Sequence, residues 1–149
     1  NILCIGDVVA ALAASFSDSV AVLKKLKSVD LVIANGENSA DGNGLTPASA
    51  GYLFHSGVDV ITTGNHAFRR RESYALYEEH PYVLRPANFP EGHARQGSCL
   101  VDLGRLQVQV INLMGTVYLE SLDCPFRTAD RILAEPDRPK ITVVDFHAE

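Results

Sequence analysis

The feature that most constrains the fold is the regular alternation of short apolar runs with longer segments of helical character. These runs are too short for helices. Their residues are too continuously apolar to belong to strands that have one solvent-exposed face and one buried face. We interpret them as strands at residues 2–5, 31–34, 58–62, 82–85 and 141–146. Near-continuous apolar strands are typical of parallel sheets that are covered on both faces.

Helix-length segments separate these strands, and we expect helices near residues 18–27, 47–56, 70–79 and 128–134. The second of them has the clearest signals, because Thr46 is suited to cap it, Pro47 to begin it and Gly57 to end it. Two alternating runs within 99–113, on either side of Gly104, indicate a hairpin. The sequence therefore predicts an α/β fold with a mixed, mainly parallel sheet covered by helices.

Composition and charge narrow the class of protein. A chain of 149 residues suggests one domain, and its net charge of −5 argues against non-specific binding to nucleic acid or to an anionic membrane. No apolar run approaches the roughly 20 residues that span a bilayer, and we find no signal-peptide pattern. The three cysteines lack a C-x-x-C spacing and suit a reducing compartment. We expect a cytoplasmic protein that binds neither duplex nucleic acid nor membrane; a homo-oligomer is compatible with these features.

Polar side chains follow the predicted strands at the points where the strands end. Asp7 follows the first strand, Glu37 and Asn38 the second, Asn65 and His66 the third, and His147 ends the last. Ligands of open α/β sheets bind at the carboxyl ends of the strands, so these groups should gather at one edge. Their oxygen and imidazole donors suit a divalent ion such as manganese, iron or zinc.

Each of these residues also has a structural interpretation when taken singly. Asp7 can cap a turn, Asn38 can occupy one, and His66 and His147 can be ordinary structural histidines. Glu37 is harder to explain in this way, because an unpaired carboxylate beside a buried strand is costly. Their repetition at four strand ends favours a metal site.

The motifs resemble a known family. G-D at 6–7, N-G-E-N at 35–38, G-N-H at 64–66 and D-F-H-A-E at 145–149 are similar to motifs of the calcineurin-like metallophosphoesterases, and most closely to those of the bacterial YmdB-type phosphodiesterases. Stretches between them, such as L-R-P-A-N-F-P-E-G at 84–92, extend the similarity over most of the chain. Val9 and Glu37 stand where the wider superfamily has a histidine and an aspartate, and both are typical of the YmdB type.

The resemblance implies a role for each residue. Asp7 would bind one metal, Glu37 would bridge two, and Asn65 and His147 would bind the second. Asn38 would lie in or just outside the ligand shell, and His66 would be the general acid that protonates the leaving alkoxide. The implied cofactors are two divalent ions, iron or manganese first and zinc as the alternative.

The chain also departs from the family pattern. It ends before a G-T-H-T-H motif whose histidines complete the metal shells, and it has Ala10 and Thr116 where glycine and arginine are common. We therefore expect residues 1–149 to be a partial metallophosphoesterase domain, an incomplete sandwich whose C-terminal part is missing and which binds metal weakly by itself.

The function that the resemblance implies is hydrolysis of a small-molecule phosphodiester, such as the cyclic nucleotide cAMP, by a metal-activated hydroxide. Two alternatives remain open from the sequence. One is a regulatory module that binds a nucleotide or a partner without turnover, and the other is a phosphomonoesterase that uses the same site.

Overall fold

The computed structural model describes residues 1–9, 14–90 and 97–148. Strands and helices alternate along most of the chain, as the apolar runs predict. In chain order the elements are β1 (Ile2–Ile5), α1 (Ala14–Leu26), β2 (Leu31–Asn35), α2 (Pro47–His55), β3 (Val60–Thr62), α3 (Ser73–Glu79), β4 (Ser98–Asp102), β5 (Gln107–Met114), α4 (Pro125–Leu133) and β6 (Ile141–His147).

The described strands form two three-stranded sheets. The first has the order β1-β2-β3 and is entirely parallel, with Ile33 of β2 opposite Cys4 of β1 and Val60 of β3. The second has the order β4-β5-β6, in which β4 and β5 are antiparallel and β5 and β6 are parallel. The predicted mixed, mainly parallel arrangement is confirmed, and its strands are divided between two sheets.

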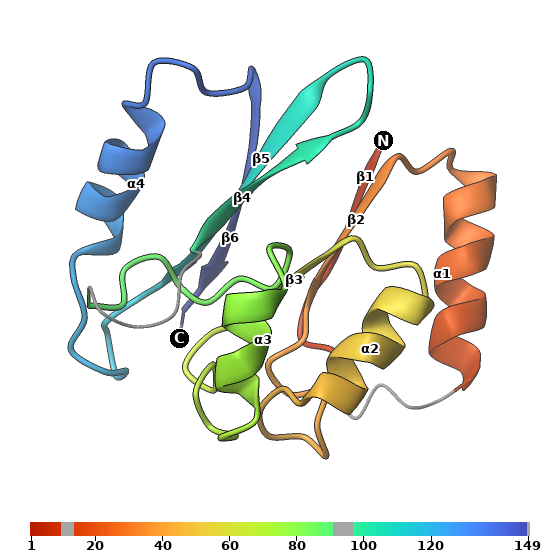
Figure 1. Cartoon of the computed structure of the whole chain (residues 1–149), viewed down its shortest axis with the longest axis horizontal. Coiled ribbons are helices and arrows are strands. Elements are labelled where there is room, and N and C mark those ends of the chain that lie inside the picture. Colours follow the sequence, from red (N-terminus) through yellow and green to blue (C-terminus); the bar gives the residue numbers. More distant parts are fainter. Residues whose placement is uncertain (10–13, 91–96, 149) are drawn as a thin grey trace.

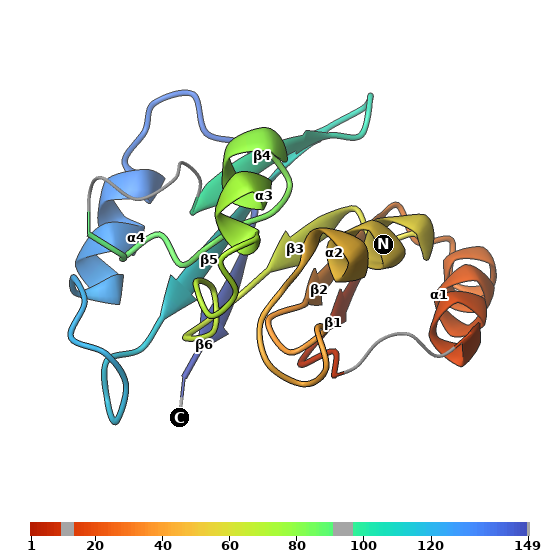
Figure 2. The same cartoon turned by 60° about the horizontal axis from the view of Figure 1, so that its bottom comes forward.

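The sheets lie face to face between two layers of helices. Figure 1 and Figure 2 both show α1 and α4 at opposite ends of the molecule with the strands between them. Helices α1, α2 and α3 share one hydrophobic core with the first sheet. Leu31, Ile33 and Val60 of the first sheet pack against Val108 and Val110 of the second. This apolar interface holds the carboxyl ends of β2, β3 and β6 near one another.

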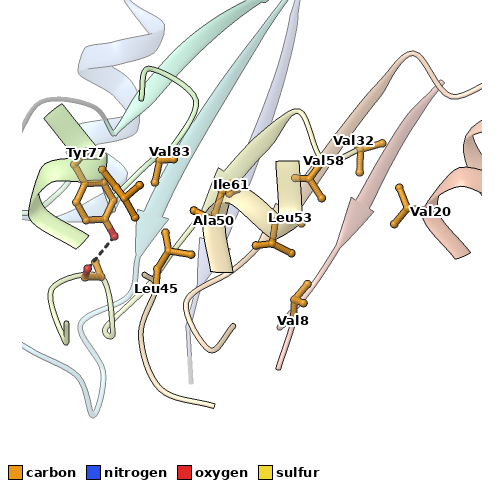
Figure 3. Close-up of a cluster of buried hydrophobic side chains, with 13 residues drawn as sticks. Val8, Val20, Val32, Leu45, Ala50, Leu53, Val58, Ile61, Tyr77 and Val83 are labelled. Atoms are coloured by element: carbon orange, nitrogen blue, oxygen red, sulfur yellow. Dashed lines mark hydrogen bonds between the residues drawn. The ribbon is translucent and has the colours of Figure 1, made fainter. Parts of the chain in front are cut away.

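The larger core lies between the first sheet and its helices. Val20 of α1, Leu53 of α2 and Tyr77 of α3 converge on Val32 and Ile61 of the sheet (Figure 3). Tyr77 is only 2% exposed, and its hydroxyl donates a hydrogen bond to the carbonyl of Ala67, a bond of 2.9 Å. The segment that follows β3 is thereby fixed to the core.

Helix α2 begins where its sequence signals predict. Thr46 is the N-cap, Pro47 is the first helical residue, and a capping box joins Thr46 to Ser49. Gly57 follows the helix with φ +96°, a conformation that favours glycine.

Four predicted elements differ from those observed. Residues 82–85 do not form a strand; they make a single parallel bridge, between Val83 and Ile61. Helix α1 begins at Ala14 and α4 at Pro125, earlier than residues 18 and 128, whereas α3 begins at Ser73 rather than near residue 70. A proline at the first position explains the start of α4, because its fixed φ suits that position and its missing N–H is not needed there.

The helices in the described part of the chain include none that is both long and apolar enough to cross a membrane.

Cys99 should resist alkylation in the folded protein. Burial raises the pKa of its thiol to about 12, so at pH 8 the thiolate should be more than about a thousandfold scarcer than for an ordinary cysteine. Mass spectrometry after brief iodoacetamide treatment should find Cys99 unmodified and the exposed Cys124 labelled. Labelling of Cys99 as fast as Cys124 in the native protein would contradict this expectation; unfolding before treatment should make the two equal.

Candidate functional site

Residues at the ends of four different strands meet at the carboxyl ends of the two sheets. Asp7, Asn38 and His66 form one series of side-chain contacts, and Glu37 joins His66 to His147. This brings together five of the six residues that the sequence singles out. Their assignment as metal ligands and general acid stays a prediction.

Glu37 lies at the centre of this group. Its side chain is 3% exposed, Oε2 accepts a hydrogen bond of 3.0 Å from the backbone N–H of His66, and Oε1 lies 3.1 Å from His147 Nδ1. Gly36, just before it, donates its N–H to the carbonyl of Thr62 and so holds this chain segment against the end of β3. Glu37 is thus a buried carboxylate whose position is set by the backbone on both sides.

His147 reaches Glu37 from the second sheet because of the alternation along β6. Residues two apart in a strand point to the same face, so His147 shares a face with Asp145 and Val143. Asp145 accepts a hydrogen bond from the hydroxyl of Thr62 in β3 and ties the two sheets together just below the site. With Nδ1–H donated to Glu37, Nε2 of His147 is the nitrogen left for a metal, the pattern usual in metal-binding histidines.

The orientation of His66 is set through Asn38. The Asn38 amide nitrogen donates a bond of 2.7 Å to Asp7 Oδ1, which turns its carbonyl oxygen toward His66 Nδ1, 2.8 Å away. His66 Nδ1 must therefore carry a proton, and Nε2–H is the proton that the imidazolium could donate to a leaving group. Asp7 itself adopts φ +43°, a left-handed conformation that aspartate tolerates better than most residues.

Gly64 makes room for the group at its centre. A Cβ atom on Gly64 would lie 2.5 Å from His147 Cγ and 2.7 Å from Glu37 Oε2, far inside van der Waals contact. The glycine allows the backbone after β3 to pass directly behind the Glu37–His147 pair.

Asn65 is the exception among the predicted residues. It precedes His66 along the chain and lines a neighbouring pocket, which it shares with Phe68 and Arg69. Asp145, by contrast, has a structural role that the sequence motifs did not assign to it. Its spacing of two from His147 within a predicted strand could have placed both on one face.

The donor set fits a divalent cation in chemical type. Carboxylate, carboxamide and imidazole groups suit manganese, iron or zinc, and neither Asp7 nor Glu37 forms an ion pair with a lysine or arginine in the described part of the chain. Within residues 1–9, 14–90 and 97–148, no three His, Cys, Asp or Glu side chains are grouped closely enough to hold a metal. A metal at this group would therefore also draw on the carboxamide of Asn38.

Comparison with known proteins identifies the family. A profile of the family described as YmdB-like protein matches residues 3–149. The chain belongs to the YmdB-like family. A similar protein is the Bacillus subtilis protein named 2',3'-cyclic-nucleotide 2'-phosphodiesterase. It is 41% identical to this chain, and the match covers the whole of this chain. The family predicted from the motifs is thereby confirmed.

Two solved structures resemble this YmdB-like fold closely. A hypothetical protein from Thermus thermophilus superposes with a TM-score of 0.89 over 99% of the chain, at 36% identity. A phosphatase from Mycoplasma pneumoniae gives a TM-score of 0.87 over 99% of the chain, at 30% identity. The chain spans 57% of the Bacillus subtilis relative and of the Thermus structure, and 55% of the Mycoplasma structure.

Proposed function

We propose that the protein is a metal-dependent phosphodiesterase that hydrolyses small cyclic nucleotides. The observation that carries the proposal is the group around Glu37. It gathers two carboxylates, two histidines and a carboxamide at the strand ends of a YmdB-like fold, and no lysine or arginine of the described residues pairs with either carboxylate. The name of the Bacillus subtilis relative supports a cyclic nucleotide as the class of substrate.

The roles of the residues are those that the family resemblance implies, and the contacts bring all of them except Asn65 together. Asp7, Glu37, Asn38, Asn65 and His147 would hold two divalent ions, with Glu37, which contacts groups of both sheets, as their shared ligand. Bound divalent ions would supply a hydroxide at neutral pH and offset charge on the phosphoryl group. Manganese and iron suit this oxygen-rich set best, and zinc is the alternative.

His66 supplies the proton in this proposal. Its Nδ1–H donates to Asn38 Oδ1, and the Asn38 amide nitrogen donates to Asp7. These bonds fix the imidazole ring and leave Nε2–H as its second donor. A histidine placed in this way protonates the leaving alkoxide, a contribution that is typically 10²–10⁴-fold.

The experiment that tests the function uses the intact protein freed of metal and then reloaded with Mn²⁺. We expect hydrolysis of a 2',3'-cyclic nucleotide and of bis(p-nitrophenyl) phosphate to return with metal, and p-nitrophenyl phosphate, a monoester, to be turned over more slowly. Faster turnover of the monoester would favour a phosphomonoesterase. Nucleotide binding without turnover at any metal concentration would favour a regulatory module.

A further inference from the structure

A pocket of about 400 Å³ has Asn65 in its wall, and Asn65 directly precedes His66 of the candidate site. Its volume falls in the range of pockets that bind small molecules. Residues distant in sequence line it, among them Asn65, Phe68, Arg69, Phe89, Glu120 and Leu122. We call it the Arg69 pocket. The strand-end motifs do not predict it, because its walls come from the segments around residues 65–69, 89–90 and 120–122.

Arg69 is held at this pocket by the turn that also carries His66. The N–H of Arg69 donates a bond of 3.0 Å to the His66 carbonyl, and the N–H of Ala67 donates one of 3.1 Å to the Gly64 carbonyl. Arg69 therefore follows His66 by one turn. Its side chain is exposed, and within the described residues it forms no ion pair.

The neighbouring arginines differ from Arg69. Arg70 is used structurally, since its Nε donates a bond of 2.8 Å to the Asn43 carbonyl. Arg71 is exposed and does not line the pocket. Of the three consecutive arginines, Arg69 is thus the one whose charge is available to a ligand beside the site.

The aromatic wall of the pocket is fixed in place. The ring of Phe68 lies 5.4 Å from that of Phe89 and 5.3 Å from that of the buried Tyr77, centroid to centroid. Asn88, which is fully buried, donates hydrogen bonds to the carbonyls of Met114 and Asp123 and so joins the Phe89 segment to the segment that carries Leu122. The pocket is accordingly preformed, which lowers the cost of binding a ligand.

The charges that line the pocket select the kind of ligand. Arg69 attracts an anion, whereas Glu120 repels a bare phosphate and accepts hydrogen bonds from hydroxyl or amino groups. The phenyl rings offer a surface for a flat aromatic group. A nucleotide carries all three features: a phosphate, a hydroxylated sugar and a base.

We propose that the Arg69 pocket binds the nucleoside part of the substrate and that Arg69 pairs with its phosphate. The proposal rests on the phosphodiesterase function above and assigns to that site a group that selects nucleotides over simple diesters. Phe89 contacts the base, and Glu120 accepts a hydrogen bond from the sugar or the base.

The test compares two substrates with the same leaving group, p-nitrophenyl thymidine 5'-phosphate and methyl p-nitrophenyl phosphate, on the intact protein. We expect kcat/KM to be higher for the nucleoside diester. Phe89→Leu should raise KM for that substrate about tenfold and leave the methyl diester within about twofold. Arg69→Gln should lower kcat/KM for both substrates about tenfold, and the matched control Arg71→Gln should change neither. Equal kcat/KM for the two diesters, or equal effects of Phe89→Leu on both, would overturn the proposal.

A binding measurement separates this proposal from the proposed function. If neither diester is hydrolysed, the phosphodiesterase function fails, and calorimetry with adenosine 5'-monophosphate still tests the pocket. Binding that Phe89→Leu weakens about tenfold and Arg71→Gln leaves intact supports the pocket. Absence of binding, or binding that Phe89→Leu leaves unchanged, overturns it.

Discussion

Replacing Glu37 by glutamine should lower phosphodiester hydrolysis by the intact protein on the order of a thousandfold. The variant keeps the shape of the side chain and removes its charge. One of the two oxygens becomes an NH₂ group, which must then face either the His66 N–H or His147 Nδ1–H, and both of these are donors. Metal analysis of the purified variant, alongside steady-state kinetics on a chromogenic diester, should show lower metal content together with lower turnover.

Glu79→Gln is the matched control for this prediction. Glu79 lies at the exposed end of α3, so the same loss of charge there should leave metal content and turnover unchanged. Wild-type turnover in Glu37→Gln would rule out a carboxylate at this position as an essential ligand. Equal losses in both variants would point to net charge rather than to the site.

Replacing Gly64 by alanine should affect both stability and activity. The added methyl group would fall 2.5 Å from His147 Cγ and 2.7 Å from Glu37 Oε2, so at least one of these side chains must move. Overpacking of this kind typically costs about 1–3 kcal/mol of unfolding free energy. Because the displaced groups are the proposed ligands, hydrolysis should fall by roughly a hundredfold or more. Urea unfolding followed by circular dichroism, together with kinetics, measures both effects.

Gly51→Ala provides the control, because the chemical change is identical and the surroundings are open. Gly51 lies within α2, and a Cβ atom there would have no heavy atom within 4 Å. Alanine in a helix interior should raise stability by about 0.5–1 kcal/mol and leave activity unchanged. A Gly64→Ala variant as stable and active as the wild type would mean that the backbone behind Glu37 can move away freely.

The sequence predicts well what depends on local signals. The strands and α2 follow from apolar continuity and from the Thr46-Pro47 start, and the meeting of polar groups follows from parallel strand direction. It does not predict what depends on tertiary packing. The division into two sheets, the loss of the 82–85 strand to a single bridge at Val83, and the link between Thr62 and Asp145 all arise where distant segments meet.

The candidate site is likewise predicted in part: its residues follow from the sequence, but their contacts do not. Five polar residues are identified from their places after strands, but the order in which they contact one another is not. That Asn38 would turn toward both Asp7 and His66 depends on side-chain geometry that no spacing encodes. The Arg69 pocket cannot be predicted from the sequence for a related reason. Its walls come from three separate segments, of which Asn88 joins two and the contact between the rings of Phe68 and Phe89 joins the third.

Glu37 follows a strand of one sheet and His147 ends a strand of the other. Any ligand that both residues bind therefore cross-links the two sheets. Mass action then couples occupancy of the site to cohesion of the sandwich, since a ligand that binds only the folded state adds its binding free energy to stability. Ligand binding at the site and packing of the apolar interface between the sheets thus stabilise the same folded state.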